Sequence, residues 1–248
     1  MLVYKAWRES RARFLLALSA LVLFSFGFLL RARTTFPPPE YPMLPYAAVV
    51  WSTFYGAWRT VAFSMVALIL GLGGLQRERA AGTAAFTLAL PVNRVQLLGA
   101  RAVVGVFELT ALSLVPAALV PTLSPALVHQ SYPLTQCLHF AALFMSWGVV
   151  WFAAGFLWSI LFTGDYTAAG VSVLTPFAYM VVYANVSRGG LRFPSANPFA
   201  FMSGDIDLGG FSRGLLTRPL PWVTIAVLGL VTTALLAAAW RLTERQNF

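Results

Sequence analysis

Few residues in this 248-residue chain have the types and spacing needed for chemistry. His129 and His139 belong to no HExxH motif, so their spacing does not indicate a zinc site. Cys137 is the single cysteine, which excludes an intrachain disulfide and a cysteine-based metal cluster. The sequence also contains no GxSxG motif and no P-loop. We therefore expect no catalytic residue, no metal site and no ATP hydrolysis by the chain itself.

Charged residues inside apolar stretches are the next candidates, because such charges are expensive in a membrane and often functional. If an apolar helix begins near Gly99, a rise of 1.5 Å per residue places Glu108 about 13 Å deep, near the bilayer midplane. There Glu108 would either bind a substrate or a proton, or bond across helices to a Ser or Thr. Arg101 is expected to extend to the interface. Arg59 lies about 24 Å from the end of its own apolar stretch, with aromatic residues around it, and is expected at the opposite interface.

The composition places these residues in a membrane protein. Hydrophobic residues make up 59% of the chain and charged residues 10%, with a mean hydropathy of +0.75. Soluble domains have about 45–50% apolar and about 25% charged residues, so a soluble protein is excluded. The apolar content also excludes a disordered chain. We expect the net charge of +9 to lie at membrane edges, against anionic lipid, and not to bind nucleic acid.

Six apolar stretches are long enough to cross a bilayer, for which about 20 residues are needed. We expect one all-α transmembrane domain over 1–248, broken in its fifth span by Pro176, with a long external loop at 187–220. Ten of the 17 Lys and Arg residues lie on the side of the termini, which predicts that both termini are cytoplasmic. The expected spans are 14–30, 47–75, 98–120, 137–162, 168–186 and 221–240.

The basic segment Tyr4 to Arg13 precedes the first span. Residues 4, 7, 11 and 14 fall on one face of a helix, which predicts an interfacial helix lying on the membrane. A basic flank that only orients the first span fits equally well.

A second polar segment, Gln76 to Arg101, separates the second and third spans. Gly82 and Thr83 can end one helix and cap the next, since a threonine hydroxyl accepts from an exposed backbone N–H. Ala84 to Leu90 would then form a short helix, which Pro91 ends.

This segment resembles the cytoplasmic segment between the second and third spans of ABC-2 type transporter permeases. The resemblance is carried by Glu78, Gly82-Thr83, Leu88, Leu90-Pro91 and Asn93-Arg94. It implies a coupling helix that contacts a separate cytoplasmic ABC ATPase. The residues at that contact would be Glu78, Gly82, Thr83, Pro91 and Arg94.

The resemblance further implies the membrane half of an ATP-driven exporter in the cell membrane. ATP and Mg²⁺ would bind the partner ATPase, and this chain would carry no cofactor. A second permease half, identical or different, would complete the path for a lipid-like, drug-like or other substrate. Two alternatives remain open: a secondary transporter or ion channel that uses Glu108, and a membrane scaffold subunit that transports nothing.

Overall fold

Helices make up almost all of the described chain. The computed structural model describes residues 2–35, 46–72, 94–162, 165–188, 196–205 and 214–245, and no strand occurs among them. Six helical segments are long and apolar enough to cross a membrane, so the architecture is that of a multi-pass membrane protein. The helices are α1 (Leu2–Thr35), α2 (Tyr46–Val49), η1 (Val50–Tyr55), α3 (Ala57–Gly71), α6 (Arg94–Leu127), α7 (Leu134–Leu161), α8 (Asp165–Arg188), α9 (Pro198–Met202) and α10 (Trp222–Arg245).

The described residues of all six expected apolar stretches are mainly helical, but three details of the prediction differ from the structure. Residues 2–13 belong to the same helix as the first span, so they form no separate interfacial helix. Helix α8 continues through Pro176, where a break was expected. A proline removes only one helical hydrogen bond, and helices in apolar surroundings tolerate this loss.

The second span, expected to be continuous, is broken at Gly56. The six-residue π-helix η1 ends there, and Gly56 takes an extended conformation (ψ −179°) before α3 begins. A Cβ atom at this position would lie 2.3 Å from the carbonyl oxygen of Ser52, so only glycine fits. Discontinuous helices of this kind are common where membrane proteins build internal sites.

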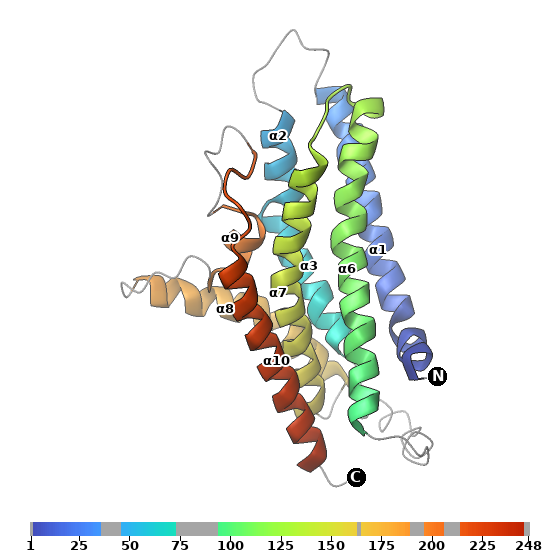
Figure 1. The fold of residues 1–248 in the computed structure, drawn as a ribbon, viewed down its shortest axis with the longest axis vertical. Coiled ribbons are helices and arrows are strands. Elements are labelled where there is room, and N and C mark those ends of the chain that lie inside the picture. Colours follow the sequence, from blue (N-terminus) through green and yellow to red (C-terminus); the bar gives the residue numbers. More distant parts are fainter. Residues whose placement is uncertain are drawn as a thin grey trace.

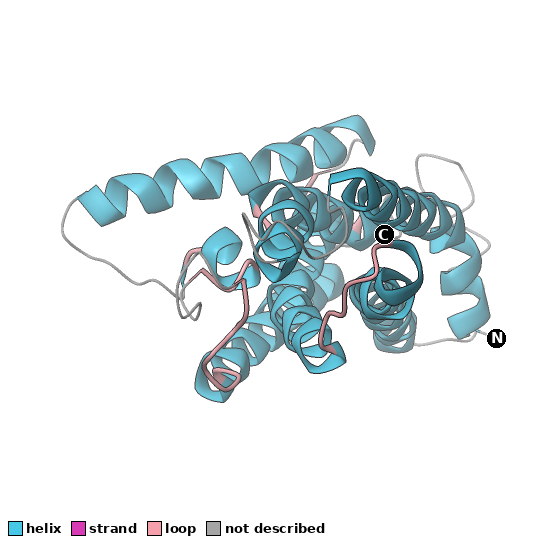
Figure 2. Cartoon of the chain, turned by 90° about the horizontal axis from the view of Figure 1, so that it is seen from above, coloured by secondary structure: helices cyan, strands magenta, loops and turns pink. Residues whose placement is uncertain are grey.

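Helix α7 is the centre of the bundle. It contacts α3, α6 and α10, while α1 packs along α6 (Figure 1). At Gly155 a Cβ atom would lie 2.2 Å from the carbonyl oxygen of Leu68, so the backbones of α7 and α3 meet without a side chain between them. Seen from above, α8 lies at one side and runs across the other long helices (Figure 2).

The N-terminal end of α1 and the C-terminal end of α10 lie at the same end of the bundle (Figure 1). Helix α3 ends there and α6 begins there, so the expected coupling segment departs from this same end. We call this end of the bundle, where both described termini lie, the terminal end. Which side of a membrane it faces remains a prediction from the charge distribution.

Part of the expected external loop 187–220 packs into the bundle. The side chain of Asn197 caps α9 by accepting from the backbone N–H groups of Phe199 (3.1 Å) and Ala200 (3.2 Å). Phe201 and Met202 of α9 are buried. The indole of Trp51 donates to the carbonyl of Ser203 at 2.7 Å, which ties this turn to η1.

Candidate functional site

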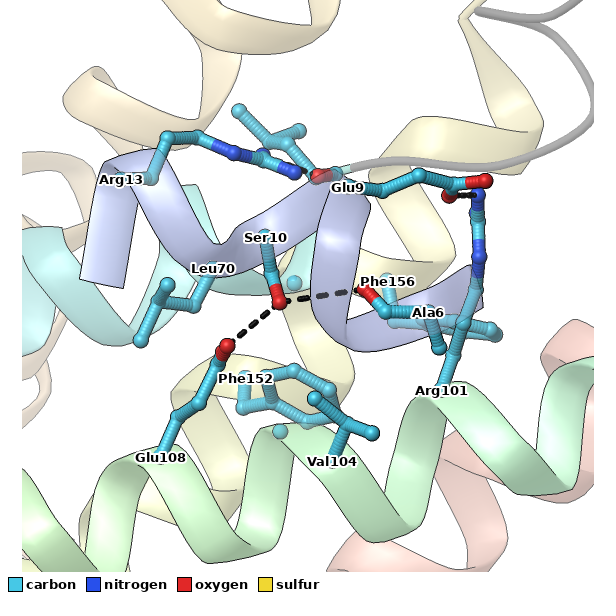
Figure 3. Close-up of a pocket in the computed structure, with 13 residues that line it drawn as sticks. Ala6, Glu9, Ser10, Arg13, Leu70, Arg101, Val104, Glu108, Phe152 and Phe156 are labelled. Carbon is cyan, nitrogen blue, oxygen red and sulfur yellow. Dashed lines mark hydrogen bonds and ion pairs between the residues drawn. The ribbon is translucent and has the colours of Figure 1, made fainter. Parts of the chain in front are cut away.

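Four helices line a small cavity near the terminal end, in which charged and polar side chains lie among apolar ones. It is formed by the first turns of α1, the end of α3 and facing parts of α6 and α7 (Figure 3). The space open to the centres of water molecules is about 30 Å³, enough for roughly two waters. Its polar lining residues are Glu9, Ser10, Arg13, Arg101 and Glu108.

Helical spacing on α1 explains why these side chains meet. Ala6, Ser10 and Arg13 are four and three residues apart, so they share one face, and this face points towards α6 and α3. Tyr4, which shares another face with residues 7, 11 and 14, is 65% exposed. The face of α1 that lines the cavity is therefore rotated from the one that carries Tyr4. The packing of α1 on α6 determines this rotation, and the hydrophobic pattern of α1 does not.

Glu108 is buried in α6 at the bottom of this cavity, with 1% of its surface exposed. Its Oε1 atom is in hydrogen-bond contact with the hydroxyl of Ser10, 98 residues away in the sequence. Its Oε2 atom is buried and has no hydrogen-bond partner in the part of the chain that the structure describes. The sequence left two roles open for Glu108, and the Ser10 contact is the cross-helix bond foreseen in one of them.

The guanidinium of Arg13 caps the end of α3. Its Nη1 atom donates to the carbonyl of Ile69 at 2.8 Å and also to that of Leu72. The last carbonyl groups of a helix have no helical partner and carry partial negative charge, so a cation there is favourable. Arg13 thus stabilises the C-terminal end of α3.

Arg101 of α6 forms an ion pair with Glu9 of α1, and Lys5 lies 3.9 Å from the other oxygen of Glu9. The side chain of Arg101 is only 13% exposed. A carboxylate of the neighbouring helix thus offers Arg101 a partner, and its expected position near the interface stays a prediction. Through Arg13 and Glu9, α1 is bonded to α3 and α6 on either side of residues 73–93.

The side chains of the expected coupling residues lie outside the part of the chain that the structure describes. Glu78, Gly82, Thr83 and Pro91 lie outside the described residues. Arg94 is the first residue of α6, but its side chain also lies outside them. Their proposed contact with an ATPase stays a prediction.

Arg59 is the second buried charge, with 2% of its surface exposed. Its guanidinium carbon lies 4.1 Å, 5.2 Å and 4.9 Å from the ring centres of Phe54, Tyr55 and Phe144. Its Nη1 atom is 3.5 Å from the carbonyl of Phe54, and no carboxylate among the described residues forms an ion pair with it. Cation–π contacts of this kind stabilise a desolvated guanidinium by about 2 kcal/mol or more.

Most of the aromatic neighbours of Arg59 face the interior of the bundle and so do not form an aromatic belt towards lipid. Trp51, Phe54 and Tyr55 are buried, and only Trp58 is exposed, at 66%. The break at Gly56 lies between these aromatic residues and Arg59, and it lets η1 and α3 direct both sets of side chains inward.

Sequence reasoning missed three residues of the cavity: Glu9, Ser10 and Arg13. The signal was present in the spacing of Ala6 and Ser10, since two small residues four apart allow close helix packing in membranes. This spacing does not predict which helix packs against α1. Among the described residues, no cluster of His, Cys, Asp and Glu side chains could hold a metal ion.

No protein-family model matches this chain, and no curated protein matches it either. A functional proposal therefore rests on the sequence pattern and on the arrangement of the helices.

Proposed function

We propose that this chain is the transmembrane permease subunit of an ATP-driven exporter of the ABC-2 type, in the cell membrane. A separate ATPase subunit, which binds ATP and Mg²⁺, would dock at the terminal end. The substrate would be lipid-like, drug-like or another molecule carried across the membrane. A second permease half, identical to this chain or different, would complete the path.

The observation that carries the proposal is the bracing on both sides of residues 73–93. Arg13 of α1 holds the end of α3, and Glu9 of α1 holds Arg101 of α6. A force applied to the segment between α3 and α6 would therefore act on three helices at once. A coupling element needs such bracing, because a loosely attached loop would bend without moving the spans.

In the proposed mechanism, ATP-driven closure of the ATPase pair pushes on the coupling segment. Gly82 and Thr83 set the bend of this segment and Pro91 ends its short helix. Glu78 and Arg94 pair with the ATPase or with each other. The push tilts α3 and α6, and α3 transmits the motion to α7 through the close backbone contact at Gly155.

Affinity purification of the tagged full chain from detergent-solubilised membranes tests this proposal. An ABC ATPase subunit is expected to co-purify in stoichiometric amount, and the reconstituted complex should hydrolyse ATP. If the chain purifies without an ATPase and moves a solute without ATP, the proposal is wrong.

A secondary transporter or ion channel is the second candidate, favoured by the Oε2 atom of buried Glu108, which has no partner among the described residues. Proteoliposomes that contain only this chain distinguish the two functions. A secondary transporter or channel would pass ions down an imposed gradient, and Glu108→Gln would change that flux. A permease half without its ATPase would pass none.

A further inference from the structure

The contact with Ser10 satisfies only one oxygen of the Glu108 carboxyl group among the described residues. The oxygen of Ser10 is in contact with Oε1 of Glu108 and also lies 3.2 Å from the carbonyl of Ala6 (Figure 3). A hydroxyl carries one proton and can donate to only one of these acceptors at a time. The carbonyls of Ala6 and Trp7, the latter 3.3 Å from the Ser10 hydroxyl, already accept N–H groups within helix α1, so the contact with Ser10 is the hydrogen bond that the described residues offer Glu108.

The second oxygen of Glu108 distinguishes the ionised from the neutral form of its side chain. An ionised carboxylate in an apolar site needs partners at both oxygens, but Oε2 has none among the described residues. Val104 and Phe152 line the same cavity and offer no hydrogen bond. A neutral carboxylic acid leaves only a carbonyl oxygen unpaired, which is far less unfavourable.

The charged groups around Glu108 come from two helices. Helix α1 contributes Glu9 and Arg13, and α6 contributes Arg101. Arg13 is bonded to the end of α3, and Arg101 is paired with Glu9, to which Lys5 also lies close. The described lining residues of α3 and α7 include no ionisable side chain. No described cation forms an ion pair with Glu108.

We propose that Glu108 is a proton-binding site and that it holds its proton in the conformation described here. The protonated Oε1 of Glu108 donates a hydrogen bond to the oxygen of Ser10, and the hydroxyl of Ser10 donates one to the carbonyl of Ala6. Ser10 then accepts one proton and donates another, and Glu108 carries no charge next to its unpartnered Oε2 atom among the described residues. On release, the proton passes to a water molecule in the cavity and Glu108 becomes a carboxylate. The hydroxyl of Ser10 then turns away from Ala6 and donates to this carboxylate.

Proton release would loosen the contact between α1 and α6. The new negative charge would lie against an apolar wall, and it would draw in either more water or the guanidinium of Arg13. If Arg13 moved, the end of α3 would lose its cap. This inference does not depend on the exporter proposal, because it concerns only the resting state of one side chain.

Infrared spectroscopy of the purified full chain in lipid nanodiscs at neutral pH tests the proposal. A protonated carboxyl gives a C=O stretching band that a carboxylate lacks. The band is expected in the wild type, absent in Glu108→Gln and retained in Glu244→Gln, a control at an exposed site in α10. Identical spectra of wild type and Glu108→Gln would overturn the proposal, and so would loss of the band in Glu9→Gln instead.

A second variant leaves Glu108 in place and is useful even if Glu108→Gln does not fold. Ser10→Ala removes the acceptor of the proton, so the C=O band should persist and move to a higher wavenumber. Raising the pH should replace the band with carboxylate bands in wild type. A band that stays at the same position in Ser10→Ala would show that Ser10 does not accept this proton, and the proposal would be wrong.

Discussion

Arg13 in α1 donates to the backbone carbonyl of Ile69 in α3 across 2.8 Å, although 56 residues separate the two in the sequence. A second bond from the same guanidinium reaches Leu72, the last described residue before the segment that resembles a coupling helix. One side chain of α1 thus bonds the last carbonyl groups of α3.

Replacing Arg13 with glutamine should weaken the end of α3. A bond from a charged donor to a backbone carbonyl contributes about 1.5–3 kcal/mol, and the shorter, neutral glutamine cannot reach both carbonyls. We expect Arg13→Gln to lower the thermal stability of the detergent-solubilised chain. Arg11→Gln, at an exposed site on the same helix, should leave it unchanged. Equal stability of the two variants would contradict the capping role.

Glu78→Ala tests the proposed coupling segment. If Glu78 contacts the ATPase or orders the segment, its loss should uncouple ATP hydrolysis from transport in the reconstituted complex. ATP hydrolysis should continue while substrate movement falls about tenfold or more, since a lost charged contact of about 1.4 kcal/mol changes an equilibrium tenfold. Glu244→Ala, an exposed carboxylate at the C-terminal end of α10, is the control. Full transport by the Glu78→Ala complex would mean that the coupling assignment is wrong.

Gly155→Ala should separate the backbones of α3 and α7. The added Cβ atom would lie 2.2 Å from the carbonyl oxygen of Leu68, so one helix must move. Overpacking of this kind destabilises by about 1–3 kcal/mol. The matched control is Gly229→Ala in α10, where no atom lies within 4 Å of the new Cβ. Thermal unfolding should show a loss of stability in the first variant and none in the second, and the opposite order would contradict the packing described.

A double-mutant cycle between Arg59 and Phe144 tests the aromatic enclosure of the buried guanidinium. Arg59→Met and Phe144→Leu each remove one partner of a contact of 4.9 Å. We expect a coupling free energy of about 1–2 kcal/mol from thermal unfolding of the two single variants and the double variant. Phe152 lines the separate cavity, so a cycle between Arg59→Met and Phe152→Leu should give about zero. Similar coupling in both cycles would mean that Arg59 has no specific contact with Phe144.

The six apolar helices could be predicted because hydropathy and length are properties of consecutive residues. The same reasoning overestimated the effect of Pro176 on the helix. This proline removes one helical hydrogen bond without ending α8. It also missed the break at Gly56, which depends on the close approach of the Ser52 carbonyl and not on hydropathy. Glu108 was identified as a candidate from its position in an apolar stretch, but its partner was not.

The sequence by itself determined that this chain forms apolar helices of membrane-spanning length, because each helix satisfies its own backbone hydrogen bonds and only its average polarity matters. Only the tertiary structure decided which faces turn inward. Ser10 meets Glu108, and Arg13 meets Ile69, because α1 packs with a particular rotation against α6 and α3. Arg59 is buried for the same kind of reason. These contacts depend on side-chain packing between distant helices, which no local pattern of residues encodes.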